Sequence, residues 1–262
     1  MSSVDSEAIV LRRFDYSESS QVAHLLTPDH GRISVLAKGI KRPNASLKGP
    51  MDLFQYAEVR YLRRRGMDLL VRYRPLTGFS PLRERLDSLY AAFYITEVAW
   101  SLSQEEVGEP LLFSLLGRAL AGLALADEGA ISGVVIAAEL ALLQCCGFSL
   151  ALETCAGCGE KGVSDSVLYP RSGGFLCLTC RRDQSSAVVL TAGARAALSQ
   201  LASDESHRAQ RFRLSPSQGG ELRSLLDQVM VGVMERRLRS ARFLRLGAVS
   251  RGPAPVHSQK DR

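Results

Sequence analysis

The sequence predicts an α+β fold, in which an N-terminal five-stranded barrel of the oligonucleotide-binding (OB) type is followed by an α-helical domain with an inserted four-cysteine zinc ribbon. Three observations predict this fold. Short β-type runs separated by turn residues fill the N-terminal part of the chain. A helical spacing of apolar residues replaces them after Pro75 and Pro81. Four of the six cysteines form two C-x-x-C pairs. A chain of 262 residues has room for two or three small domains.

The barrel, residues 1–78, is predicted from runs rich in β-branched and aromatic residues. Turn chemistry at residues 27–31 and 63–66 closes two hairpins, because Pro28 presets its own φ and glycine tolerates a positive one. A basic loop with two glycines and two prolines, residues 38–50, separates the third and fourth strands. Five short antiparallel strands are typical of an OB barrel. The predicted strands are residues 8–14, 22–26, 32–37, 55–62 and 68–73.

Residues 79–246 are predicted to form the helical domain, because apolar residues recur there at steps of three to five. Thr191 is a candidate N-cap for a helix that ends at Leu201. A last helix is predicted from Ser217 to Leu246. The tail, residues 247–262, has two prolines and no apolar period, so we expect it to be disordered.

The two C-x-x-C pairs predict a structural zinc ribbon at residues 153–183, with Cys155, Cys158, Cys177 and Cys180 as ligands. Four thiolates fill a tetrahedral Zn²⁺ site and leave no position for water, so the ion is expected to hold structure. Two disulfides and four unrelated core cysteines are the alternatives, and the absence of an export signal disfavours them. The adjacent Cys145 and Cys146 point about 100° apart on a helix and are expected to pack in the core.

The charge is unevenly distributed along the chain. Residues 1–78, 79–150 and 151–262 carry net balances of +5, −6 and +7. Two basic ends favour a polyanionic partner such as nucleic acid, and an arginine-rich solubilising surface is the alternative. The arginines of residues 236–245 are expected to wind around the last helix, which leaves solvent exposure and phosphate contact equally open. The candidate DNA-binding residues are Arg32, Lys38, Lys41, Arg42, Lys48, Arg63, Arg64, Arg65, Arg72, Arg171, Arg181 and Arg182.

Aromatic residues are interleaved with the basic residues of the barrel. Rings stack on bases while cations follow phosphates, so this mixture is typical of barrels that hold single strands. For each ring taken alone, burial in the barrel core is the stronger interpretation. The rings concerned are Phe14, Phe54, Tyr56, Tyr61 and Tyr73.

No catalytic constellation is found in the sequence, so we expect no enzyme. The four histidines are scattered, and neither a phosphate-binding G-x-x-x-x-G-K-[ST] loop nor a G-x-G-x-x-G motif is present. A metalloenzyme such as a zinc deaminase is disfavoured, because all four candidate ligands are thiolates and no H-x-E motif accompanies them. Apolar stretches contain Arg118 or Glu139 and are judged too short for a membrane span. We therefore expect a cytoplasmic protein.

Several segments resemble the bacterial RecO family of recombination mediators. They are residues 8–12 (AIVLR), 16–20 (YSESS), 25–32 (LLTPDHGR), 37–41 (AKGIK), 52–54 (DLF) and 238–244 (LRSARFL). The order of barrel, helices, ribbon and closing basic helix is similar as well. Some members of the family lack the four cysteines, so the zinc prediction rests on the spacing in this chain.

The resemblance implies a non-enzymatic, nucleoid-associated DNA repair and recombination protein. Such proteins bind single- and double-stranded DNA and anneal complementary strands. The implied partners are RecR and single-strand-binding protein, with the recombinase RecA as an indirect one. An RNA-binding or ribosome-associated zinc-ribbon protein remains the alternative, because a basic barrel and a ribbon would serve it equally well.

Overall fold

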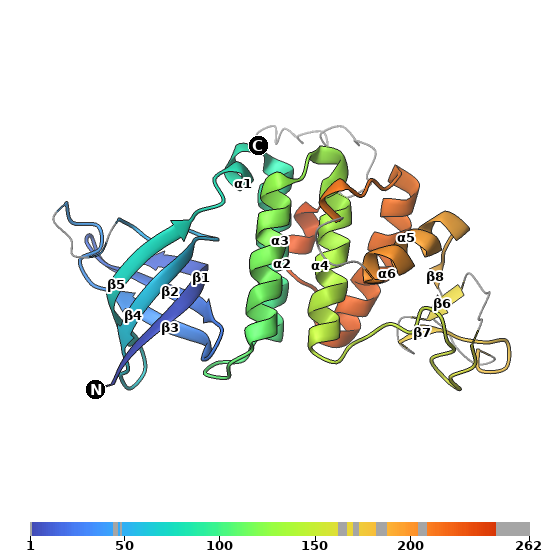
Figure 1. Cartoon of the computed structure of the whole chain (residues 1–262), viewed down its shortest axis with the longest axis horizontal. Coiled ribbons are helices and arrows are strands. Elements are labelled where there is room, and N and C mark those ends of the chain that lie inside the picture. Colours follow the sequence, from blue (N-terminus) through green and yellow to red (C-terminus); the bar gives the residue numbers. More distant parts are fainter. Residues whose placement is uncertain are drawn as a thin grey trace, which may run out of the picture.

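A computed structural model of the chain describes residues 2–43, 47, 49–161, 167–169, 173–181, 188–203 and 209–244. The predicted fold class is confirmed. The barrel forms one end of an elongated molecule, the helices form the middle, and the cysteine ribbon lies at the other end (Figure 1). The predicted disordered tail, residues 247–262, lies outside the described residues.

The five strands close into a barrel in the order β1-β2-β3-β5-β4, and all neighbours are antiparallel except β3 and β5. A register shift between Val10 and Arg12 of β1 re-aims the second half of that strand. Beyond the shift, Arg12 lies opposite His24 and Phe14 opposite Val22. The strands are β1 (Ser3–Asp15), β2 (Gln21–Thr27), β3 (Gly31–Ala37), β4 (Tyr56–Leu62) and β5 (Asp68–Thr77).

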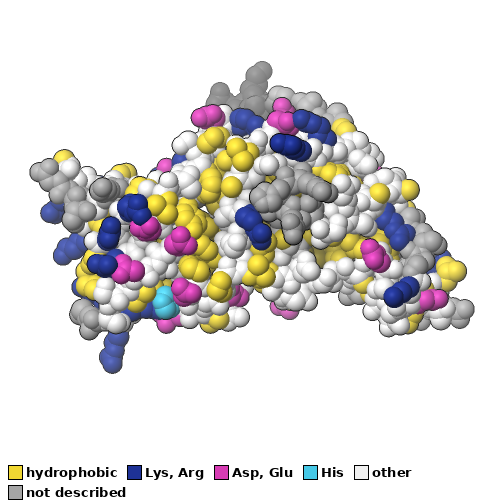
Figure 2. All heavy atoms as spheres, in the orientation of Figure 1, with side chains coloured by type: hydrophobic (Ala, Val, Ile, Leu, Met, Phe, Trp, Pro, Cys, Tyr) yellow, Lys and Arg dark blue, Asp and Glu magenta, His cyan; other side chains and the backbone are white. Residues whose placement is uncertain are grey.

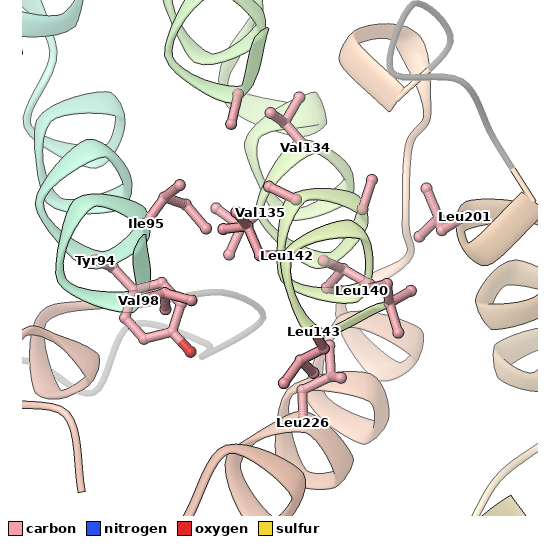
Figure 3. Close-up of a cluster of buried hydrophobic side chains, with 14 of the residues drawn as sticks. Tyr94, Ile95, Val98, Val134, Val135, Leu140, Leu142, Leu143, Leu201 and Leu226 are labelled. Atoms are coloured by element: carbon pink, nitrogen blue, oxygen red, sulfur yellow. The ribbon is translucent and has the colours of Figure 1, made fainter. Parts of the chain in front are cut away.

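The helical domain is built around α4, which is buried along most of its length. Figure 3 shows Val135 and Leu142 of α4 facing Ile95 of α2, and Leu143 close to Leu226 of α6. The helices are α1 (Pro81–Glu84), α2 (Leu86–Leu102), α3 (Pro110–Leu125), α4 (Ile131–Cys145), α5 (Ala192–Ser203) and α6 (Pro216–Met234), with 3₁₀ turns η1 (Glu128–Ala130), η3 (Ala209–Arg211) and η4 (Ser240–Phe243).

The segment Glu128–Cys145 is, by length and composition alone, apolar enough to cross a membrane, whereas the sequence suggested that such stretches were too short. Two thirds of it, 67%, is buried inside the helical domain. This burial is what a central core helix requires.

Helix caps follow the sequence closely at two places. The hydroxyl of Thr191 accepts a hydrogen bond from the backbone N–H of Ala194 at 3.2 Å, so it caps α5 as predicted. Ser215 and Gln218 form a reciprocal capping box at the start of α6, which satisfies two backbone donors.

The prediction of one closing helix to Leu246 is wrong. Helix α6 ends at Met234, because Glu235 adopts a left-handed conformation with φ +54°. The chain then crosses α2, where the carboxylate of Glu97 accepts hydrogen bonds from the backbone N–H groups of Arg239 and Ser240 at 3.0 and 2.8 Å. Phe243 stacks on Tyr90 with ring centroids 5.3 Å apart. These contacts with α2 replace helical hydrogen bonds, so tertiary packing overrides the local helical pattern.

The barrel and the helical domain are joined by backbone contacts. The N–H of Arg32 donates to the carbonyl of Gln104 at 3.0 Å, and the N–H of Glu106 donates to the carbonyl of Arg32 at 3.2 Å. Gly108 lies so close to the β2–β3 turn that a Cβ atom there would be 2.4 Å from the carbonyl oxygen of Asp29. Apolar side chains of the barrel, among them Ile9, belong to the same buried cluster as the helices. The barrel is therefore packed against the helical domain.

Candidate metal centre and nucleic-acid surface

The four predicted cysteine ligands come together in the ribbon. The Sγ atoms of Cys155, Cys158, Cys177 and Cys180 all lie within 4.8 Å of one another, and those of Cys158 and Cys177 are 3.8 Å apart. A tetrahedral Zn²⁺ site with bonds of about 2.3 Å has sulfur atoms about 3.8 Å apart. The donor set and its spacing therefore fit a four-thiolate metal site.

The backbone of the ribbon prepares one of these sulfurs to carry negative charge. Backbone N–H groups of Cys177, Cys158 and Gly157 lower the pKa of Cys155 to about 6. Hydrogen bonds with the neighbouring cysteines, first with Cys177, raise the pKa of Cys180 to about 12, because they favour its protonated form. A cation among the four sulfurs would favour the deprotonated form of each thiol instead.

The knuckle around the first pair depends on a glycine. A Cβ atom at Gly157 would be 3.1 Å from the Sγ of Cys180, so only glycine leaves the sulfur undisturbed. The N–H of Cys155 donates to the carbonyl of Glu160 at 2.8 Å and closes the loop. Cys145 and Cys146 lie elsewhere, at the end of α4, partly buried against the helical core as the sequence suggested.

Several candidate DNA-binding residues are engaged within the protein. Lys41 Nζ is 2.7 Å from an Asp15 carboxylate oxygen, and Arg63 pairs with both Asp68 and Glu106. Arg32 contacts the ring of Trp100. Arg181 ends the second cysteine knuckle and has interactions of its own. These cations are held in place before any ligand arrives, which lowers the entropic cost of using them.

Other candidates point into solvent. Within the described residues, five of the candidates are exposed and take part in no ion pair: Lys38, Arg42, Arg64, Arg65 and Arg72. They lie on the loop after β3, on the β4–β5 hairpin and on β5. Lys48, Arg171 and Arg182 fall outside the described residues, so the structure does not place them.

The structure separates core aromatics from surface aromatics. Phe54, Tyr61 and Tyr73 are buried, which agrees with the stronger interpretation of each ring in the sequence. Phe14 is 53% exposed and Tyr16 is 67% exposed. Tyr16 was not among the sequence candidates, although it follows Phe14 at the two-residue spacing that places side chains on one face of a strand.

A surface that the sequence did not reveal lies where the barrel meets the helices. The guanidinium carbons of Arg12 and Arg32 are 4.0 and 4.3 Å from the ring centroid of Trp100. The ring of His24 meets that of Trp100 edge to face at 5.1 Å. A pocket of about 550 Å³ adjoins this surface and shares Arg32, Trp100 and Arg236 with it. We call this surface the joint groove and define it by Arg12, Phe14, His24, Arg32, Trp100, Arg236 and Arg239.

Residues from β1, β2, β3, α2 and the segment after α6 meet in the joint groove. Arg236 donates to the hydroxyl of Ser101 at 2.7 Å and lies 3.6 Å from Glu97, so the segment after α6 is fixed to α2. No sequence pattern relates the positions of the groove, because β1, α2 and this segment lie far apart in the chain. Figure 2 shows hydrophobic side chains gathered between barrel and helices on one face of the molecule, with basic and acidic side chains beside them on the barrel.

Comparison with known proteins matches both halves of the chain. Residues 1–79 match the family model described as "Recombination protein O N terminal", and residues 83–242 match "Recombination protein O C terminal". The chain is 32% identical over 240 residues to a DNA repair protein RecO of Roseiflexus sp. (strain RS-1), covering 91% of this chain and 84% of the relative. It is 30% identical over 250 residues to the protein of that name in Desulforudis audaxviator, covering 95% and 99%.

Proposed function

The chain belongs to the RecO family of DNA repair proteins, and from this premise we propose that it is a non-enzymatic mediator that binds single- and double-stranded DNA and anneals complementary strands. The observation that carries the proposal is a closed barrel with unpaired cations on one loop and one hairpin, in a chain that matches both domains of the family. Cations of this kind contact phosphates, and a barrel of this kind holds single strands.

Annealing follows from screening of phosphate charge. Barrel cations such as Arg42 and ribbon-side arginines such as Arg181 neutralise the phosphates of two strands, which reduces the repulsion between the strands. Base pairing then supplies the free energy, so no nucleotide hydrolysis is required. The chain itself contributes charge and a surface on which the strands meet.

Zinc is the ion that we propose for the ribbon. Cys155, Cys158, Cys177 and Cys180 would hold it, and four thiolates leave no open coordination position. Bound zinc supplies folding free energy to a segment too small to build its own core. The hydrogen bond from the N–H of Arg181 to the carbonyl of Cys177 at 3.1 Å then ties Arg181 to the second cysteine knuckle.

The partners that we propose come from family membership. They are RecR, single-strand-binding protein and, indirectly, the recombinase RecA, whose loading onto coated strands the chain would assist. A protein that acts on chromosomal DNA in a bacterium is also expected to be located in the cytoplasm.

A strand-annealing assay tests the function. Two complementary oligonucleotides, one with a fluorophore and one with a quencher, are mixed with protein of measured zinc content, with and without single-strand-binding protein and without nucleotide. We expect faster quenching in both cases. No acceleration on naked strands would contradict the annealing proposal, and preference for RNA over DNA of the same sequence would favour the RNA-binding alternative.

A further inference from the structure

We infer that the joint groove is the binding site for single-stranded nucleic acid, with a base over the exposed ring of Phe14 and phosphates on the arginines around Trp100. This inference rests on the proposed function and assigns the strand to a surface beyond the barrel loop. The path would run from the outer face of β1–β2 across the joint to the segment after α6.

The rings of the groove form a continuous series. Phe14 meets His24 edge to face with centroids 5.8 Å apart, and His24 meets Trp100 in the same manner at 5.1 Å. The series ends at Phe14, which is 53% exposed and leaves part of its ring in contact with water. Stacking of a base on an aromatic ring contributes about 1–3 kcal/mol, so an exposed ring beside cations is a suitable platform.

Trp100 acts as a positioning residue for two arginines. A guanidinium that lies over an aromatic ring is held by cation–π attraction, and N–H groups at its rim can still donate hydrogen bonds. Arg12 and Arg32 contact Trp100 in this way from different strands of the barrel. Arg32 is held further, because its Nε donates to the carbonyl of Ser103 at 3.1 Å and one terminal nitrogen lies 4.0 Å from Glu105. Their orientation is thus set in advance, which reduces the entropy lost when a phosphate binds.

The groove collects more positive charge than it neutralises. Glu97 faces Arg236 and the backbone of Arg239, whereas the side chains of Arg12 and Arg239 take part in no ion pair with any residue that the structure describes. Partial burial lowers the pKa of Arg12; Glu97 opposes this effect, and the charges of Arg32, Arg236 and Arg239 add to it. A phosphate between these arginines would relieve their repulsion.

The chain offers a built-in reporter, because Trp100 is its only tryptophan. The experiment titrates the full chain with a labelled oligothymidylate of about 20 nucleotides, longer than the 4–16 nucleotides that one such barrel covers. Label anisotropy measures total binding, and Trp100 emission measures occupancy of the joint groove. We expect both signals to change with the same midpoint.

Two variants test the contacts. Arg12→Gln and Phe14→Ala should each weaken binding about tenfold, since one removes a charged hydrogen-bond donor and the other removes a stacking surface. Arg12→Gln should also reduce the log-log salt slope by about 0.7. Arg118→Gln is the matched control, because Arg118 is an exposed arginine of α3 outside the groove. Thermal unfolding of each variant separates lost contacts from lost folding.

The outcomes separate the groove from the function. The groove assignment would be overturned by three results together: label anisotropy shows normal binding, Trp100 emission does not change, and the groove variants bind no more weakly than Arg118→Gln. The proposal of DNA binding would still stand. An oligonucleotide that does not bind the wild-type chain at all would overturn both.

Discussion

The guanidinium of Arg223 in α6 donates two hydrogen bonds to the carboxylate of Glu139 in α4, at 2.8 and 2.7 Å, inside the helical core. Glu139 is completely buried, and the hydroxyl of Tyr94 in α2 donates to the same carboxylate. Three helices thus share one polar network. Because polar groups in an apolar core need partners in fixed places, the network specifies how α2, α4 and α6 align.

Removal of Arg223 from its pair with Glu139 should lower the free energy of unfolding. Arg223→Met leaves the carboxylate of Glu139 without its cation, and we expect a loss of about 3–5 kcal/mol in the free energy of unfolding, measured by urea denaturation. The control is Arg213→Met, which breaks an exposed pair with Asp127 and should cost about 0–1 kcal/mol. Equal losses in the two variants would show that the buried network does not align the helices.

Loss of one cysteine ligand should release the metal. Cys155→Ser is expected to lower the zinc content from about one ion per chain to near zero, measured by mass spectrometry of the metal, because a three-thiolate site binds the ion far more weakly. Cys145→Ser, which changes a cysteine outside the cluster, should keep the zinc. Cys155→Ser protein that retains a full complement of zinc would exclude Cys155 as a ligand.

The hydrogen bonds to Glu97 lead us to predict that the free energy of unfolding depends on pH. Partial burial would raise its pKa, but hydrogen bonds from the Ser240 hydroxyl and from the N–H groups of Ser240 and Arg239 lower it overall. A carboxylate with a lowered folded-state pKa stabilises the fold above its unfolded pKa of about 4.3, and this contribution is lost as pH falls through the folded-state value.

Glu97→Gln should therefore lower the free energy of unfolding by about 1–3 kcal/mol at neutral pH. The loss should be much smaller at a pH below the folded-state pKa of Glu97, where the wild-type carboxyl group is protonated as well. Thermal unfolding at several pH values measures the difference, with the exposed Glu84→Gln as control. A constant difference between wild type and Glu97→Gln at every pH would contradict the assigned hydrogen bonds.

At Gly108 the backbones of the barrel and the helical domain lie so close together that a side chain should destabilise the joint. Gly108→Ala places a Cβ atom 2.4 Å from the carbonyl oxygen of Asp29, so the barrel turn and the α2–α3 loop must separate. We expect a loss of about 1–3 kcal/mol. Gly220→Ala in α6 meets nothing within 4 Å and should instead stabilise by about 0.5–1 kcal/mol. Calorimetric melting temperatures that move in the same direction for both variants would refute the close contact.

The barrel loop should contribute phosphate contacts that salt weakens. Single-stranded DNA affinity should fall with a log-log slope of about −0.7 for each phosphate contacted, measured by anisotropy. Lys41→Glu combined with Arg42→Glu should reduce both affinity and slope. Because Lys41 is paired with Asp15, the single variant Arg42→Glu separates lost DNA contact from local repulsion. A flat salt response would contradict phosphate binding altogether.

Local patterns predicted much of the fold. The alternation of β-type residues found all five strands, and β1 starts earlier than expected because residues 3–7 pair with β4 despite little hydrophobic content. Leucine spacing found the core helices. The cysteine spacing found the complete cluster, because two C-x-x-C knuckles each fix their own thiolates.

The same patterns failed at the closing helix and at the joint groove. Beyond the end of α6, the backbone of Arg239 and Ser240 donates hydrogen bonds to Glu97, and no local sequence window contains these contacts. Trp100 and Arg12 are 88 residues apart, and only the docking of α2 on the barrel brings them together. A charge count placed positive charge at both ends of the chain, but it did not show which cations are already paired.

By itself, the sequence determined the strands, the core helices, the four-cysteine cluster and the family, since each depends on residues close together in the chain or on a linear order of segments. Only the tertiary structure decided where the last helix ends, which aromatics face solvent and which arginines surround Trp100. Those features depend on competition between local hydrogen bonding and contacts formed when distant elements pack, and that competition is settled only in the folded chain.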